Sequence, residues 1–406
     1  MIPHARAALE QPLAAEPRTS PDGADVLHGV RLGINAIPIL SPMAGVGQYT
    51  YHLIHQLQQL LPQAPWLFYG TSWERGVRTS AAPAARKLNI AIKRYLPRPD
   101  MLIRLMRQGR FTAGANAHGI DLYHEPAFMA YRFRGPSVVT VHDISWVRHP
   151  ETHPVERVRE MNRVMPGVVR HAKQIVVDSD FVRQEVIGHY GVVPERVTTV
   201  PLGVSPEFHP LEATQCAPVL SRFGVKHGEY ILAVGTLEPR KNLTTALAAY
   251  TRLPEAFRRR YPLVVAGMNG WGMEGLSGSL KAMITRGEVR LTGYVPQQDL
   301  PALYSGARTL VYPSLYEGFG LPPLEAMACG TPAIVSRRAS LPEVVGEAGV
   351  LVEPLDDQAI AYHMQQLAED DALHARLAEA GRLHARQFTW RKFALDMLAV
   401  YRQALS

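Results

Sequence analysis

The sequence has few cysteines and no long apolar run. Two of its 406 residues are cysteine, Cys216 and Cys329, and no CxxC spacing is present. We interpret them as free thiols in a reducing compartment, which argues against a disulfide framework. Because no stretch of 18 apolar residues occurs, the sequence predicts no membrane-spanning helix.

The N-terminus also lacks the apolar segment of a secretion signal. We therefore expect a loose leader over residues 1–29 and a cytoplasmic protein. Hydrophobic residues make up 47% of the chain, so two domains of ordinary size could each bury a core. The charged fraction of 19% does not suggest disorder.

Short apolar runs alternate with helical segments along the chain. The runs predicted as strands are residues 32–39, 66–69, 122–124, 138–142, 175–178 and 197–201, followed by residues 230–235, 263–267, 289–292, 309–313, 333–336 and 350–352. Helices are expected between most of them, for example at residues 48–61, 245–250 and 324–328. Near-continuous apolar strands that alternate with helices are typical of parallel sheets covered on both faces. The sequence thus predicts doubly wound α/β domains.

A proline-rich stretch without periodicity, residues 202–218, separates the two series of strands and is interpreted as a linker. We expect one domain over residues 30–205 and a second over 206–385. The tail, residues 363–406, is predicted to be helical throughout, and residues 386–406 could pack back on the first domain. Ligands of open α/β sheets bind beyond the carboxyl ends of the strands, so functional side chains should follow strands directly.

The segment YPSLYEGFGLPPLEAMACG, residues 312–330, carries the most specific pattern. Glu317 and Glu325 are separated by seven residues and flank a glycine-rich turn that runs into a short helix. Gly318 and Gly320 allow close approach to a ligand, and the helix N-terminus suits a diphosphate. A plain helix start with an acidic first turn would not explain the paired glutamates.

Three other segments follow predicted strands. Arg240 and Lys241 lie in AVGTLEPRKNL, after the strand that ends at Gly235, and could clamp phosphate oxygens instead of forming a solvated basic turn. His142 ends a strand in VVTVHDIS, where a structural histidine is the alternative. Gly45 and Gly47 form a glycine loop that is too incomplete for a dinucleotide fingerprint.

Together these segments resemble the retaining glycosyltransferases of family 4. The resemblance implies an α/β protein of the GT-B fold, two Rossmann-like doubly wound domains facing a cleft. It implies that Glu317 contacts the donor sugar, that Glu325 contacts the donor ribose, and that His142 lies near the reacting sugar. The catalytic residues expected are His142 and Glu317. The donor-binding residues expected are Gly45, Gly47, Gly235, Thr236, Arg240, Lys241, Gly318, Phe319, Gly320, Leu321 and Glu325.

One departure from the family pattern concerns the phosphate clamp. Many members carry arginine directly after the glycine that ends the first strand of the second domain, whereas this sequence has Thr236. The clamp would then depend on Arg240 and Lys241. The form GTLEPRKN is similar to mannosyl- and rhamnosyltransferases of bacterial polysaccharide assembly, so we expect a GDP-sugar donor and a glycan or polyprenyl-linked acceptor. The alternatives are a UDP-sugar donor, a GT-B epimerase or a noncatalytic homologue.

No metal or other cofactor is expected. Asp178 and Asp180 form a DxD sequence, a metal-binding motif in another glycosyltransferase fold. Here they end a strand, and Asp180 could cap the following helix, so we interpret the motif as structural. A nicotinamide-dependent oxidoreductase would need a complete GxGxxG with a downstream acidic residue, which the sequence lacks.

Positive charge is concentrated in one part of the first domain. Residues 73–114 contain ten Lys and Arg against two acidic residues, so their net charge of +8 exceeds the +7 of the whole chain. Apolar residues are interleaved with the basic ones in a pattern that Pro97 and Pro99 divide into two short helices. Such a segment can lie on an anionic membrane, at the cytoplasmic face of the inner membrane, or simply form a solvated surface. Nucleic acid is not an expected partner.

Overall fold

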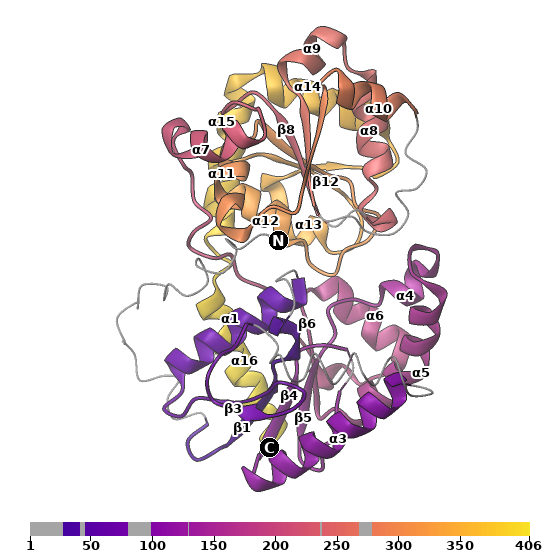
Figure 1. The fold of residues 1–406 in the computed structure, drawn as a ribbon, viewed down its shortest axis with the longest axis vertical. Helices are drawn as coiled ribbons and strands as arrows, with labels where there is room; N and C mark the ends of the chain where they lie inside the picture. Colours follow the sequence, from indigo (N-terminus) through magenta and orange to yellow (C-terminus); the bar gives the residue numbers. More distant parts are fainter. Residues whose placement is uncertain (1–26, 41–44, 80–98, 129, 236–237, 268–277) are drawn as a thin grey trace. The chain divides into compact units, whose positions relative to one another are not determined.

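The computed structural model describes residues 27–40, 45–79, 99–128, 130–235, 238–267 and 278–406. These residues form two compact units (Figure 1). The N-terminal unit holds residues 27–147, 155–203 and 390–406 of the described chain, and the C-terminal unit holds residues 148–154 and 204–389. The chain therefore passes between the units more than once.

The N-terminal unit is built on a seven-stranded sheet with the order β3-β2-β1-β4-β5-β6-β7. Its strands are β1 (Leu32–Asn35), β2 (Trp66–Phe68), β3 (Trp73–Glu74), β4 (Leu122–Glu125), β5 (Ser137–Thr140), β6 (Gln174–Val177) and β7 (Val197–Thr199). Every neighbouring pair is parallel except β2 with β3. Its helices are α1 (Gly45–Leu60), α3 (Pro99–Ala117), α4 (Ser145–Arg148), α5 (Val155–His171), α6 (Asp180–Tyr190) and α16 (Trp390–Leu405), with 3-10 turns η2 (Ile37–Leu40) and η4 (Pro194–Arg196).

The C-terminal unit contains a six-stranded parallel sheet with the order β10-β9-β8-β11-β12-β13. Its strands are β8 (Ile231–Val234), β9 (Leu263–Ala266), β10 (Val289–Gly293), β11 (Thr309–Tyr312), β12 (Ala333–Ser336) and β13 (Val350–Val352). Its helices are α7 (Ala213–Arg222), α8 (Leu243–Arg252), α9 (Glu255–Arg260), α10 (Gly278–Thr285), α11 (Leu300–Ser305), α12 (Leu321–Ala328), α13 (Leu341–Val345), α14 (Asp357–Glu369) and α15 (Asp371–Ala385). Short 3-10 turns are η3 (Pro150–Thr152), η5 (Pro239–Lys241), η6 (Gln297–Asp299) and η7 (Gly346–Ala348).

Burial explains why the strands could be recognised from sequence. The central strands β1, β4, β6, β9, β11 and β12 are buried at every residue, as expected for a sheet with helices on both sides (Figure 1). A strand is present at each of the twelve predicted places, which confirms the prediction of an α/β fold. The prediction missed β3, which has two residues. It also extended the first strand to Ile39, whereas β1 ends at Asn35 and Ile37–Leu40 form a 3-10 turn.

The helical tail is broken, contrary to the sequence prediction. Helix α15 ends at Ala385 and α16 begins at Trp390, and Val204 forms a β-bridge with Thr389 between them. Helix α16 then belongs to the N-terminal unit, where Tyr401 Oη lies 2.7 Å from Nδ1 of His124 on β4. The other ring nitrogen of His124 contacts the Thr140 hydroxyl at 2.9 Å, and Thr140 in turn contacts Tyr49 Oη at 2.7 Å. This buried chain of polar groups connects α16 to two strands and to α1.

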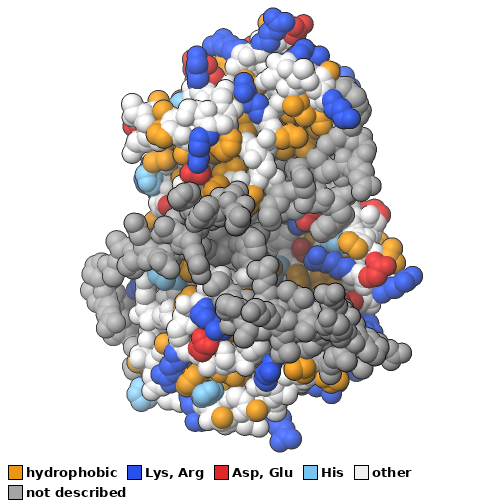
Figure 2. Space-filling model, viewed as in Figure 1, with side chains coloured by type: hydrophobic (Ala, Val, Ile, Leu, Met, Phe, Trp, Pro, Cys, Tyr) orange, Lys and Arg blue, Asp and Glu red, His pale blue; other side chains and the backbone are white. Residues whose placement is uncertain are grey.

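Within the described residues, no helix has the length and apolar character needed to cross a bilayer. Positively charged side chains are visible on both units in Figure 2 and gather at the end of the C-terminal unit, where α9 lies in Figure 1. Helix α9 contributes three successive arginines, Arg258–Arg260. Local clusters of basic side chains therefore also occur outside residues 73–114.

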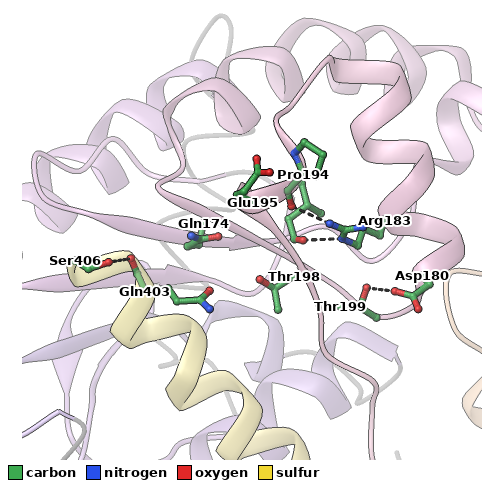
Figure 3. A pocket seen from close by; sticks show the side chains of 10 residues that line it. Gln174, Asp180, Arg183, Pro194, Glu195, Thr198, Thr199, Gln403 and Ser406 are labelled. Atoms are coloured by element: carbon green, nitrogen blue, oxygen red, sulfur yellow. Dashed lines mark hydrogen bonds between the residues drawn. The ribbon is translucent and has the colours of Figure 1, made fainter.

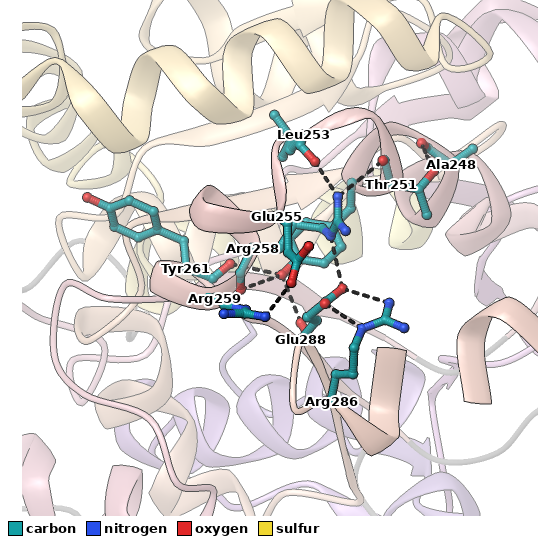
Figure 4. Close-up of polar contacts among 10 residues, drawn as sticks. Ala248, Thr251, Leu253, Glu255, Arg258, Arg259, Tyr261, Arg286 and Glu288 are labelled. Carbon is teal, nitrogen blue, oxygen red and sulfur yellow. Dashed lines mark hydrogen bonds and ion pairs between the residues drawn. The ribbon is translucent and has the colours of Figure 1, made fainter. Parts of the chain in front are cut away.

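One of these arginines belongs to a buried ionic cluster (Figure 4). Glu288, whose side chain is 1% exposed, accepts hydrogen bonds from Arg258 Nε at 2.9 Å and Arg286 Nε at 2.7 Å. The hydrogen bonds, above all the one from Arg286, lower the pKa of Glu288 to about 2 against the opposing effect of burial. Arg258 also donates to the Leu253 carbonyl, so the cluster joins the end of α8 to the start of β10.

We expect Glu288→Gln to destabilise the C-terminal unit near neutral pH. The lowered pKa corresponds to roughly 3 kcal/mol of stability, which is fully present above the unfolded pKa of 4.5 and is lost as the pH falls toward 2. Denaturant unfolding should therefore separate the variant from the natural protein at pH 7 and much less at pH 3. Glu255→Gln, which breaks the exposed pair with Arg259, is the matched control and should change stability little. A pH-independent effect of Glu288→Gln would contradict this account.

Candidate functional site

The centre of the candidate site is an ionic cluster in the C-terminal unit. Glu317, 5% exposed, follows β11, and its two carboxylate oxygens accept hydrogen bonds from different cations. Lys241 Nζ donates to Oε1 at 2.7 Å, and Arg240 Nη1 donates to Oε2 at 2.9 Å. Because β8 and β11 are neighbouring parallel strands, the turn after β8 and the loop after β11 meet at one edge of the sheet. The structure thus brings together three of the predicted residues.

The cluster has further internal partners. Arg240 Nε also donates to Glu238 at 3.1 Å, and Lys241 Nζ donates to Tyr312 Oη at 2.6 Å. Burial alone would raise the pKa of Glu317, but Lys241 and Arg240 outweigh it and lower this pKa to about 2. Burial lowers the pKa of Lys241 in spite of the Glu317 charge. Glu317 is therefore ionised across the physiological pH range and forms an ion pair with each of the two cations.

Helix α12 begins beside this cluster, but its first turn has fewer free donors than expected. Gly320 is the N-cap with a φ of 121°, and Leu321 is the first helical residue. Pro322 and Pro323 come next and have no N–H group. Only part of the usual set of N-terminal N–H groups is available for an anion, so the lysine and the arginine must supply most of the positive charge.

The loop between Glu317 and α12 is held by hydrogen bonds from a neighbouring segment. The Ser340 hydroxyl lies within hydrogen-bonding distance of the carbonyl oxygens of Glu317 and Phe319, at 2.9 and 2.7 Å. A Cβ atom at Gly320 would come within 2.6 Å of Leu341, so the position has no room for a side chain. Gly318 is buried in the same loop. The predicted glycine-rich segment is therefore a tightly packed turn.

Glu325 lies on α12 and faces a different set of partners. Its Oε2 accepts a hydrogen bond from Tyr304 Oη at 2.9 Å. Burial, assisted by the charge of Glu207, raises the pKa of Glu325 to about 7 despite that bond. No sequence pattern points to Tyr304 or Glu207, because each comes near Glu325 only through the tertiary fold. Glu317 and Glu325 thus differ strongly in protonation, which suits different partners in a donor.

Gly235 directly follows β8 with a φ of 144° and lies against the side chain of Lys241. A small cavity next to it is lined by Lys241 and Tyr312 together with apolar side chains of the sheet and α8. Thr236, predicted to follow Gly235 in the donor site, lies outside the described residues.

His142, Gly45 and Gly47 belong to the N-terminal unit. His142 is 9% exposed and both of its ring nitrogens have partners. Nδ1 lies 2.7 Å from Asp178 Oδ2, and Nε2 lies 2.9 Å from the Pro126 carbonyl oxygen. Burial lowers the pKa of His142, but the Asp178 charge and the two hydrogen bonds together raise it above its ordinary value. Both ring nitrogens are engaged, so the ring cannot accept a proton from a substrate without losing a partner.

A buried carboxyl that was not predicted from the sequence, that of Glu125, supports the turn that contains Pro126, the carbonyl partner of His142. Glu125, at the end of β4, accepts hydrogen bonds from Asn35 at 2.9 Å, from Tyr123 at 2.6 Å and from the backbone of Ala127 at 3.0 Å. Burial raises the pKa of Glu125 to about 8. A glutamate at the end of an apolar strand was the available signal, but its partners come from two strands.

The glycine loop is a helical turn in the structure. Helix α1 begins at Gly45, so Gly45 and Gly47 lie in its first turn and not in a loop before the helix, as the sequence analysis had it. The Thr50 hydroxyl donates to the Val46 carbonyl at 2.7 Å and so ties the second turn to the first, and the Tyr49 ring packs edge-on against His142 with centroids 4.8 Å apart. The first turn of α1 is thereby placed close to His142 within this unit.

The two aspartates of the DxD sequence have different partners. Asp178 is paired with His142, whereas Asp180 accepts a hydrogen bond from Thr199 at 2.5 Å (Figure 3). Asp180 is the first residue of α6, and Ser179 is the N-cap that the sequence analysis had assigned to Asp180. Figure 3 shows Asp180 at the rim of an open pocket beside β7 and the end of α16, and none of the residues that line this pocket is a predicted site residue. In the described part of the chain, no group of three or more His, Cys, Asp or Glu is arranged to hold a metal ion.

The basic segment is described only in part. Residues 80–98 lie outside the described residues, and the second predicted helix is α3. On α3, Arg104 and Arg110 are exposed beside Leu105, which is 60% exposed, while Phe111 is buried. Arg75 and Arg78 instead lie over the rings of Trp66 and Tyr69, at 4.8 and 4.4 Å from the ring centres.

Comparison with known proteins identifies the family. Residues 43–208 match the profile described as Glycosyltransferase Family 4, and residues 223–384 match that of Glycosyl transferases group 1. The chain is 37% identical over 376 residues to the O-antigen chain mannosyltransferase B of Escherichia coli, an alignment that covers 90% of this chain and 97% of that protein. The chain belongs to glycosyltransferase family 4. The resemblance seen in the sequence motifs is thereby confirmed, and this protein is a glycosyltransferase.

Solved structures support the GT-B fold of this family 4 glycosyltransferase. Sucrose-phosphate synthase from Thermosynechococcus elongatus superposes with a TM-score of 0.68 at 21% identity, covering 92% of this chain and 98% of that chain. HepE from Anabaena, solved in complex with UDP-glucose, superposes with a TM-score of 0.66 at 19% identity, covering 91% and 98%. The two Rossmann-like domains predicted from the sequence are confirmed by this likeness.

We expect Glu317→Gln to tighten the binding of a nucleoside diphosphate by about tenfold. The carboxylate neutralises Arg240 and Lys241 in the absence of ligand, and its removal leaves two cations whose charge a diphosphate can compensate. Transfer of sugar should fall in the same variant, because Glu317 is expected to contact the sugar. Calorimetry with GDP and UDP measures the first effect.

Glu238→Gln is the matched control, since Glu238 also pairs with Arg240. It should tighten nucleotide binding in the same direction without an equal loss of transfer. Weaker nucleotide binding by Glu317→Gln would indicate that the diphosphate lies elsewhere.

Proposed function

We propose that this enzyme transfers a mannosyl residue from GDP-mannose to a glycan or polyprenyl-linked acceptor in surface polysaccharide synthesis, with retention of anomeric configuration. The observation that carries the proposal is the 37% identity to O-antigen chain mannosyltransferase B across nearly the full length of both proteins. Serotype-specific mannosyltransferase WbdA of Escherichia coli, 31% identical over 261 residues, has a related activity in its name. A related sugar or a UDP-sugar donor is the alternative.

The charge distribution of the cluster fits the chemistry of such a transfer. Cleavage of the bond between sugar and diphosphate passes through an oxocarbenium-like state, and negative charge develops on the leaving phosphate. Arg240 and Lys241 would stabilise that charge, and the Leu321 N–H would add one donor. Glu317, ionised at neutral pH, lies beside the cations and would contact the sugar. These protein cations would take the role of a metal ion, so we propose a metal-independent reaction.

Donor preference and the absence of a metal requirement can be tested together. A thermal-shift screen of GDP, UDP and ADP should show the largest rise in melting temperature with GDP, since ligands that bind the folded state stabilise it. Transfer from GDP-mannose to a mannose-containing acceptor should proceed in EDTA and yield an α-linkage. A larger shift with UDP would favour the alternative donor. Loss of transfer in EDTA that Mn²⁺ restores would refute the metal-free mechanism.

We propose further that the N-terminal unit associates with an anionic membrane surface at the cytoplasmic face. Helix α3 supports this idea, because its described side chains include Arg104, Arg107 and Arg110 and no acidic residue, with Leu105 exposed among them. A basic surface with an exposed apolar side chain suits the headgroup region of anionic lipids. A polyprenyl-linked acceptor would be presented there.

Exchange of Arg104 and Arg110 for Ser should weaken binding to anionic liposomes by about tenfold or more, since each arginine near such a surface contributes about 1 kcal/mol. Co-sedimentation at low and high salt measures the effect. The matched control exchanges Arg259 and Arg260 on α9 for Ser, which removes the same charge from the other unit and should leave binding nearly unchanged. Equal losses in both variants, or no binding to anionic liposomes, would contradict a specific membrane surface.

A further inference from the structure

Asn242, directly after Arg240 and Lys241, has an unusual backbone conformation. Its φ and ψ are 55° and 39°, in the left-handed region that residues with a side chain rarely adopt. It ends the turn η5 and is also the N-cap of α8. The residue is 7% exposed. A buried asparagine in the left-handed conformation therefore connects η5 to α8 immediately after the cationic pair.

The Asn242 side chain forms three hydrogen bonds inside the unit. Its amide nitrogen donates to the carbonyl oxygen of Pro313 at 3.0 Å and to that of Pro354 at 2.6 Å. Its amide oxygen accepts a hydrogen bond from the Thr245 hydroxyl at 2.7 Å. Pro313 follows β11 and Pro354 follows β13, so one side chain joins the turn after β8 to the ends of two other strands.

A second contact ties the same turn to the Glu317 loop. The Leu315 N–H donates to the Arg240 carbonyl at 2.8 Å, and Arg240 Nη1 donates to the Tyr316 carbonyl at 3.1 Å. Together with the bond from Asn242 to Pro313, these contacts fix residues 240–242 against residues 313–317. The positions of the two cations relative to Glu317 follow from this arrangement.

Residues with an unfavourable positive φ also lie next to the Glu317 cluster. In the described ranges, the non-glycine residues with positive φ are Asn242 and Ala339. Ala339 precedes Ser340, whose hydroxyl contacts the Glu317 and Phe319 carbonyls. Strained residues persist where surrounding contacts hold them, and they concentrate at functional sites. Both strained positions support the backbone around one carboxylate.

We propose that Asn242 is a positioning residue that preorganises Arg240 and Lys241 for the diphosphate of the donor. The side chain requirement is specific: two N–H donors for two carbonyl oxygens, one acceptor for Thr245, and tolerance of the left-handed conformation. Aspartate would tolerate the backbone but would place an oxygen against two carbonyls, and alanine would lose the bonds and increase the strain. The inference rests on the proposed phosphate clamp.

The test is a double-mutant cycle between Asn242→Gly and Lys241→Ala in the full-length protein. Glycine keeps the left-handed turn without strain and removes only the side-chain bonds. The readouts are the calorimetric affinity for inorganic pyrophosphate, which is independent of base and sugar, and kcat and KM with GDP-mannose. Lys241→Ala alone should lower turnover by roughly 100- to 1000-fold, the usual effect of losing one preorganised charge partner.

In the natural background, Asn242→Gly should lower pyrophosphate affinity and kcat by about tenfold. In the Lys241→Ala background it should change them clearly less, because Arg240 is then the one cation of the pair left for Asn242 to position. Asn242→Asp should be at least as impaired as Asn242→Gly, whereas Thr245→Val, which spares both carbonyl contacts, should retain most of the affinity.

A purely structural role would give a different pattern. Tyr261→Phe, which removes a buried hydrogen bond to the Ala368 carbonyl in the same unit, should lower the melting temperature without changing pyrophosphate affinity. Equal losses from Asn242→Gly in both backgrounds, or losses that only follow the melting temperature, would overturn the positioning role. If Lys241→Ala leaves pyrophosphate affinity and turnover unchanged, the phosphate clamp itself is wrong, and the role of Asn242 falls with it.

Discussion

The pairing of Glu317 with two cations is the interaction on which the rest of the candidate site depends. The carboxylate and the cations come from segments that are 76 and 77 residues apart in the chain, and they meet because β8 and β11 are neighbouring parallel strands. A buried ion pair that lost one member would leave an uncompensated charge, which is strongly unfavourable. The surrounding contacts of Asn242, Tyr312 and Ser340 can be understood as the supports that keep this small cluster in one geometry.

The sequence was sufficient to predict the fold because the signals were local. Buried strands such as Leu263–Ala266 are continuous apolar runs. Because a helix follows most of these strands, the pattern favours a parallel sheet covered by helices on both faces. The grouping of Arg148–Pro154 with the C-terminal unit had no such signal, since it depends on contacts like the one between His149 and Tyr316, whose ring centres lie 5.4 Å apart. The two-residue strand β3 was too short to produce a pattern.

The candidate site could be predicted by residue type but not by partner. The motifs predicted Glu317, Arg240 and Lys241 as site residues. They assigned the carboxylate to the donor sugar and the two cations to the diphosphate, and did not predict that these groups pair with one another. Their direct pairing is a consequence of the assembled turn, whereas the missing N–H groups of Pro322 and Pro323 follow from the sequence itself. Asn242 was overlooked because its two carbonyl partners, Pro313 and Pro354, follow strands that lie far from it in sequence.

The N-terminal unit uses its buried polar groups in another way. The cations of the C-terminal unit are paired with carboxylates that a phosphate could replace, whereas the two ring nitrogens of His142 are held by Asp178 and the Pro126 carbonyl. Displacing either partner would leave a buried polar atom unsatisfied, which costs about 1–3 kcal/mol. A proton-transfer role for His142 would have to overcome that cost. A ring held at both nitrogens and packed edge-on against Tyr49 of α1 is better suited to shaping the surface near this helix than to exchanging a proton.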